Sequence, residues 1–255
     1  MDRVQALESE SRVLRWGGLA GVAGGLLFLL VFVIVGTFVP AYAAEPAAAV
    51  RWFPDVRTVR IVENGLYLAV LILWVMSVVA LFRATRPSLA PALFGSVLGI
   101  VGLALLAAGA LPHVAIAPLS ELYHAPAATP GDQATLALAW LAAQGMLDAL
   151  LVAGLVVLPV SLVALGVAMA GTPAFGMRWG AFALGLGLIG LVAATVALVN
   201  PASPAAAIGM FALIAFHIAC GWKTWALSRS GRMLDDRLAV SDPAGAPRVA
   251  LERAG

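Results

Sequence analysis

The chain has 255 residues, of which 62% are apolar and 11% are charged, and its net charge at pH 7 is +2. Soluble domains average about 45–50% apolar and about 25% charged residues, so this composition excludes a soluble globular protein and predicts an integral membrane protein. The small net charge indicates no nucleic-acid partner. The single cysteine, Cys220, excludes an intramolecular disulfide and a cysteine-rich metal site.

Six apolar runs are long enough to cross the hydrocarbon core of a membrane, which takes about 20 helical residues. In chain order they lie at about residues 16–39, 61–82, 89–111, 147–170, 179–199 and 205–227. The sequence therefore predicts an all-α fold, a polytopic bundle of six transmembrane helices over residues 16–227. Residues 1–15 are a short N-terminal segment, and the polar residues 228–255 are expected to form a largely disordered tail.

Basic residues are distributed unequally between the two ends of these spans. Three lie on one side, Arg51, Arg57 and Arg60, and ten on the other: Arg3, Arg12, Arg15, Arg83, Arg86, Arg178, Lys223, Arg229, Arg232 and Arg237. Because basic residues accumulate on the cytoplasmic side of a membrane, both termini are predicted to be cytoplasmic.

A cleaved secretory signal is the alternative reading of the N-terminus. Ala41-Tyr42-Ala43 resembles a signal-peptidase site after a basic leader and an apolar run. Cleavage there would leave five spans and move the N-terminus outside. The run is longer than the apolar region of a signal peptide, which favours a retained first span.

Glycines recur at four-residue spacing in three places. They are Gly17, Gly21 and Gly25, then Gly95 and Gly99, and finally Gly176 and Gly180. Such small faces let membrane helices approach closely. We expect them to pack within the bundle, with a dimer interface as the alternative, so a homo-oligomer is not indicated.

Four segments together resemble a known group of proteins. They are PDVRTVRIVENGLYLAV, RATRPSLAPALFG, MAGTPAFGMRWGAFALGLGLIGLV and AFHIACGWKTWALSR. With the six spans, they resemble a large group of uncharacterised bacterial six-helix membrane proteins, common in actinobacteria and classed as a domain-of-unknown-function family. The resemblance covers roughly residues 15–230. It implies a multi-pass protein of the bacterial plasma membrane and carries over no site residues.

Asp148 lies inside an apolar run that extends from Ala134 to Ala170, with Gln144 one turn earlier on the same helical face. Counting about 20 residues back from Ala170 reaches Leu151, so Asp148 is expected at the outer boundary of the hydrocarbon core. It is then either an interfacial carboxylate that reaches water or part of a pocket.

The pocket hypothesis depends on other polar residues expected at the same depth. They are Glu63, Asn64 and Tyr67 at the start of the second span, His113 after the third, and Gln144. If these side chains converge with Asp148, they form an outward-facing polar pocket that exchanges protons or holds a cation. Glu63 has a simpler alternative, an ion pair with Arg60 three residues earlier.

Two further sets of residues are weaker candidates. Glu121 and His124 share a helical face in the outer loop, where His113 and Asp132 would complete a zinc shell, but no strong zinc motif such as HExxH is present. His217 lies near the middle of the sixth span. We interpret it as a buried neutral histidine hydrogen-bonded to another helix.

No motif indicates a reaction. The sequence has no nucleophile elbow, phosphate-binding loop or dinucleotide fingerprint, so an enzyme is disfavoured and no cofactor is predicted. The leading hypothesis is a non-enzymatic membrane protein that binds a lipid, a small ligand or a membrane partner protein through its outward-facing polar region. The alternatives are a small proton- or cation-coupled transporter that uses Glu63 and Asp148, and a membrane-embedded metal-dependent hydrolase.

Overall fold

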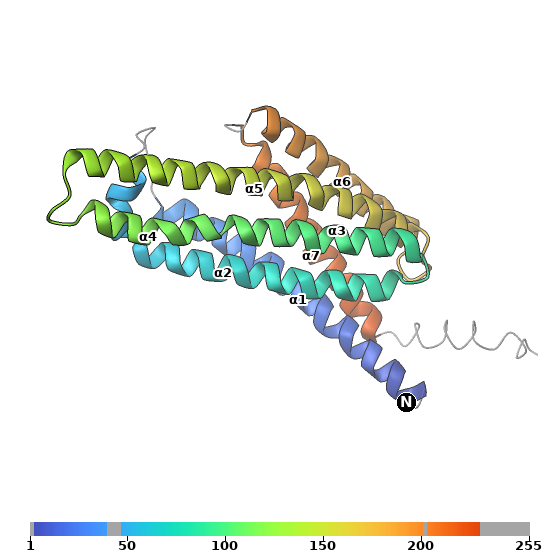
Figure 1. The fold of residues 1–255 in the computed structure, drawn as a ribbon. Helices are drawn as coiled ribbons and strands as arrows, with labels where there is room; N and C mark the ends of the chain where they lie inside the picture. The colour runs from blue at the N-terminus through green and yellow to red at the C-terminus, as the bar shows by residue number, and fades with distance from the viewer. Residues whose placement is uncertain (1–2, 40–46, 201–202, 230–255) are drawn as a thin grey trace, which may run out of the picture.

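A computed structural model describes residues 3–39, 47–200 and 203–229 of the chain (Figure 1). This part of the chain contains seven α-helices and no strand: α1 (Arg3–Phe38), α2 (Ala48–Thr85), α3 (Leu89–Gly109), α4 (Leu111–Tyr123), α5 (Pro130–Ala170), α6 (Gly176–Val199) and α7 (Ala205–Arg229). The signal-like Ala41-Tyr42-Ala43 and residues 230–255 of the predicted tail lie outside the described residues.

Six helical segments in these ranges are long and apolar enough to cross a membrane, with α3 and α4 counted as one candidate span over Leu89–Tyr123. The predicted all-α fold with six membrane-length helices is therefore confirmed. Each candidate span has an apolar window with at most two charged residues, and hydrogen bonding within a helix satisfies the backbone groups that a bilayer cannot.

The six long helices form a closed ring. Its order is α1, α2, α3, α5, α6 and α7, and α7 packs back against α1. Side chains from all of these helices meet in one apolar core, which includes Trp74, Leu103, Leu158, Ala183 and Phe216. The described chain starts and ends at the same end of the bundle, as Figure 1 shows.

Glycines permit the closest helix contacts. A Cβ atom at Gly18 would stand 2.6 Å from the backbone nitrogen of Trp225, and one at Gly180 would stand 2.7 Å from the backbone nitrogen of Ala170. Six of the seven glycines singled out above face a neighbouring helix of the same chain in this way, namely Gly17, Gly21, Gly25, Gly95, Gly99 and Gly180. Gly176 differs, because its φ of +74° serves the turn into α6, where nothing lies near its missing side chain.

Three helices continue beyond the bundle and form what we call the stalk: residues 48–60 of α2, all of α4, and residues 130–146 of α5. Figure 1 shows these segments running past the ends of α6 and α7. The stalk has its own small core of Val50, Phe53, Ile116, Tyr123 and Trp140. The stretch expected as an outer loop after the third span is thus largely helix α4, because its apolar residues recur on one face and cover α2 and α5.

Candidate functional site

A pocket of about 320 Å³ lies where five helices converge next to the stalk. Its walls are mostly apolar and include Phe28, Phe32, Leu106, Leu151 and Met210, from α1, α3, α5 and α7. Its polar lining comes from one helix, α2, which contributes Glu63, Asn64 and Tyr67. The pocket therefore combines a largely hydrocarbon interior with one polar wall.

The polar side chains of this wall are held by neighbours. The Tyr67 hydroxyl donates a 3.3 Å hydrogen bond to the carbonyl oxygen of Leu106, and its ring packs against Phe28 with centroids 5.7 Å apart. Glu63 forms the alternative contact expected from the sequence, since its Oε2 lies 2.9 Å from an Arg60 guanidinium nitrogen. The Glu63 side chain is only 12% exposed, so its carboxylate is largely withdrawn from solvent.

Asp148 does not join this wall. Leu147 and Leu151 of α5 face the pocket, whereas Asp148 lines a separate groove between α5 and α6. Its Oδ1 accepts a 3.0 Å hydrogen bond from Nε2 of Gln144 on an exposed part of the surface. The structure thus brings together Glu63, Asn64 and Tyr67, and it places the Gln144–Asp148 pair elsewhere.

His113 belongs to the first turn of α4, and the position of its side chain is not among the described features. Its backbone lies one turn beyond Gly109 and Ala110, which line the pocket.

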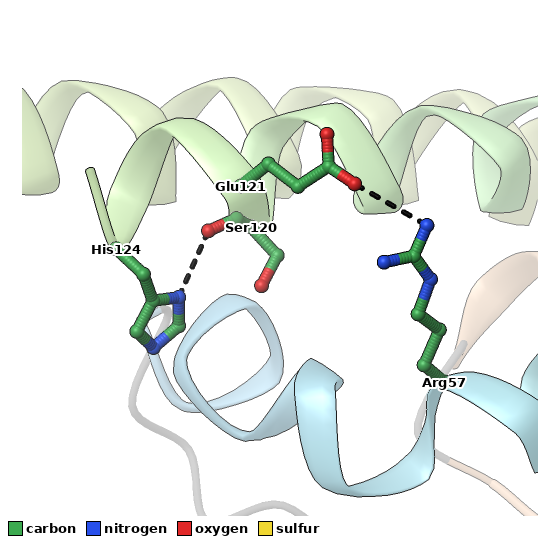
Figure 2. Close-up of polar contacts among 4 residues, drawn as sticks. All are labelled: Arg57, Ser120, Glu121 and His124. Atoms are coloured by element: carbon green, nitrogen blue, oxygen red, sulfur yellow. Dashed lines mark hydrogen bonds and ion pairs between the residues drawn. The ribbon is translucent and has the colours of Figure 1, made fainter.

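The four residues considered for zinc serve other purposes where the structure describes their side chains. Figure 2 shows that Glu121 and His124 point apart: Glu121 lies 3.2 Å from Arg57, and Nδ1 of His124 lies 2.8 Å from the carbonyl oxygen of Ser120. Asp132 caps α5 by accepting hydrogen bonds from the backbone nitrogen and hydroxyl of Thr129. Among the described residues, no three His, Cys, Asp or Glu side chains are grouped as metal ligands would be.

His217 is buried in α7 against α2. Its ring stacks on Trp74 with centroids 4.3 Å apart and planes 8° apart, and its Nδ1 makes a long 3.5 Å contact with the Ser77 hydroxyl. Phe216 packs edge-on against the same ring. This arrangement holds the imidazole within an aromatic cluster of the core.

Sequence reasoning missed one polar contact in the stalk. The Ser120 hydroxyl donates a buried 2.8 Å hydrogen bond to the carbonyl oxygen of Val50. In a regular helix that carbonyl would accept from residue 54, which here is Pro54 and has no N–H. Pro54, which precedes the predicted second span at residues 61–82, was the available signal, because a proline within a helix leaves the carbonyl four residues earlier in need of a donor.

Comparison with protein-family models, with curated proteins and with solved structures finds no match to this chain.

Proposed function

We propose that this multi-pass membrane protein binds a small amphiphilic molecule in the pocket beside Glu63, Asn64 and Tyr67. The observation that carries the proposal is the lining itself, which is apolar on most sides and polar along one helix. A volume of about 320 Å³ is at the lower end of the range of about 300–1,000 Å³ typical of small-molecule sites.

The lining suits a ligand with a hydrocarbon body and a hydrogen-bonding end. Phe28, Phe32 and Met210 offer aromatic and thioether surfaces, which adapt to an alkyl chain or a ring. A few polar groups at one side of such a site orient the ligand. The Glu63 carboxylate accepts hydrogen bonds, so the polar end of the ligand is a donor such as a hydroxyl or an amine.

The proposal also includes the kind of membrane and the orientation of the protein in it. We place the protein in a bacterial plasma membrane with both termini in the cytoplasm and the stalk outside. The distribution of charge supports this placement, because Arg83, Arg178, Lys223 and Arg229 lie at the end of the bundle opposite the stalk. At that end Arg229 covers the ring of Trp225 at 4.1 Å, a pairing that suits the interface between membrane and water.

The two alternatives, a proton- or cation-coupled transporter and a metal-dependent hydrolase, receive less support. Glu63 and Asp148 line different hollows, which does not favour a single site that couples both carboxylates. Glu121 and His124 point apart, which does not favour a hydrolytic metal centre. Amphiphile binding in the pocket remains the function that the geometry supports best.

A bulky substitution in the pocket tests the proposal. Ala207 lines the pocket from α7, and Ala215, two turns later on the same helix, is exposed on the outside of the bundle. We expect Ala207→Phe to weaken binding of a dansyl-labelled fatty alcohol to the detergent-purified protein by about tenfold or more, which is about 1.4 kcal/mol. Fluorescence enhancement of the dansyl group measures the affinity.

The control is Ala215→Phe, which adds the same ring outside the pocket and should bind the probe as the unaltered protein does. Equal affinity in the Ala207→Phe protein and its Ala215→Phe control would refute the pocket as the site. Circular dichroism melting of both variants shows whether a loss of binding comes from a loss of fold.

A further inference from the structure

A second hollow, independent of the Glu63 pocket, runs between α5 and α6. It measures about 560 Å³ and is lined along α5 by Asp148, Ala149, Val152, Ala153, Val156 and Val157. These positions follow the four-residue repeat of one helical face, so the hollow is a groove parallel to the α5 axis. Ala197 and Leu198 in the last turn of α6 form its other wall.

The groove begins at the depth where a lipid head group lies. Asp148 is 22 residues before the end of α5 at Ala170, which is about 33 Å at about 1.5 Å per residue. The hydrocarbon core is about 30 Å thick, so with Ala170 at one boundary Asp148 stands at the other. From Asp148 to Val157 the groove descends about 13 Å into the apolar layer, about the depth of one leaflet.

The charges at the upper end of the groove favour a cation. Asp148 is the ionisable side chain of the lining, and its only described polar partner is the neutral Gln144 amide. The last turn of α6 adds the negative end of a helix dipole and contains no basic residue. A positively charged group at this point meets a carboxylate and helix carbonyls together.

We propose that the α5–α6 groove holds a membrane phospholipid whose head group carries a primary ammonium. The ammonium donates hydrogen bonds to the Asp148 carboxylate, and one acyl chain lies along Ala149, Ala153 and Val157. The small alanine side chains leave space for the acyl chain of the lipid. The Asp148 carboxylate at the end of the groove selects the head group. A lipid with an anionic head group meets repulsion from Asp148.

Lipid retention by the intact protein tests this assignment. The full-length protein is placed in nanodiscs that contain equal amounts of phosphatidylethanolamine, phosphatidylcholine and phosphatidylglycerol with identical chains, then released and weighed by native mass spectrometry. We expect preferential retention of phosphatidylethanolamine. Asp148→Asn should reduce that preference about tenfold while leaving retention of phosphatidylglycerol unchanged or higher.

Two variants make the result specific. Ala153→Phe fills the groove and should remove the retained lipid whatever its head group, while Glu121→Gln neutralises a carboxylate in the stalk and should change nothing. The Ala207→Phe variant of the other pocket should also keep the ethanolamine lipid, so the two sites are tested separately.

Equal retention of phosphatidylethanolamine in the unaltered protein and in Asp148→Asn overturns the proposal. Equal retention of the choline and ethanolamine lipids also overturns it, because a trimethylated ammonium cannot donate to Asp148. If Ala153→Phe changes the oligomeric mass of the protein but not its lipid retention, the groove is a contact between copies of the chain. That result would likewise contradict a lipid site.

Discussion

Leu147 and Asp148 are neighbours in sequence, yet they face different hollows of the molecule. Successive helical residues point about 100° apart, so the leucine completes the wall of the Glu63 pocket while the carboxylate lies in the α5–α6 groove. The four-residue spacing of Gln144 and Asp148 predicted that they share a face, and the structure pairs them. Which helix lies beside that face depends on packing, which spacing within one helix does not encode.

Gly18 illustrates how a single residue controls the distance between two helices. A Cβ atom there would meet the backbone of α7, 2.6 Å from the nitrogen of Trp225 and 2.7 Å from the carbonyl oxygen of Gly221. Backbone atoms of a packed helix cannot rotate away as a side chain can. We therefore expect Gly18→Ala to lower the free energy of unfolding by about 1–3 kcal/mol, measured by denaturation in mixed detergent micelles.

Gly65 of α2 is the matched control, because, apart from its own turn of helix, no atom lies within 4 Å of the position its Cβ would take. Gly65→Ala should keep or raise the stability, by up to about 1 kcal/mol, since alanine is the better helix former. A Gly18→Ala protein as stable as the Gly65→Ala protein would contradict the close contact between α1 and α7.

At the scale of elements, a hydrogen bond from α4 to α2 compensates for a proline inside α2. Pro54 lies inside α2 and offers no N–H to the buried Val50 carbonyl, and the Ser120 hydroxyl of α4 supplies the missing hydrogen bond. An unsatisfied buried carbonyl costs about 1–3 kcal/mol. This hydrogen bond therefore gives α4 a specific attachment point in addition to its apolar contacts.

A double-mutant cycle measures this attachment. Ser120→Ala alone should lower the free energy of unfolding by about 1–3 kcal/mol, because the Val50 carbonyl loses its donor. In a Pro54→Ala background, the N–H of residue 54 serves that carbonyl, and the same Ser120→Ala change should cost about 1 kcal/mol or less. An equal cost in both backgrounds would show that Ser120 does not compensate for the proline.

The elements themselves were predictable to different degrees. The spans followed from length and hydropathy, because the thickness of a membrane demands about 20 apolar residues whatever their neighbours are. The α4 part of the stalk was not anticipated, because the stretch after the third span was expected to be an outer loop. Pro112 is tolerated in the first helical turn, and the faces of Ile116 and Tyr123 are covered by α2 and α5.

At the scale of the whole molecule, charge and shape differ between the two ends of the bundle. The stalk occupies one end, and the arginines of the α2–α3 turn and of α6 occupy the other. Placed in a Cys220→Ser protein, a cysteine at the exposed Ala139 of the stalk should react with a membrane-impermeant maleimide in intact cells. One at the exposed Pro87 should react only after permeabilisation.

Val160, an exposed residue of α5 about 15 Å from Ala170, provides the control for depth. A cysteine there should stay unlabelled in both conditions, because in the proposed placement it faces the middle of the hydrocarbon core. Labelling of position 87 in intact cells together with protection of position 139 would reverse the proposed orientation while leaving the fold intact.

In the membrane placement proposed above, with Asp148 at one boundary of the hydrocarbon core, the length of α5 would make the protein a spacer. Residues 130–146 extend the helix about 25 Å past the hydrocarbon boundary, and the small core around Trp140 joins this extension to α2 and α4. Any large molecule that approaches this surface of the membrane beside the protein meets the turn between α4 and α5 before it meets the lipid. In that proposed placement, the stalk would set a minimum distance between such a molecule and the membrane, whatever molecule the pocket or the groove contains.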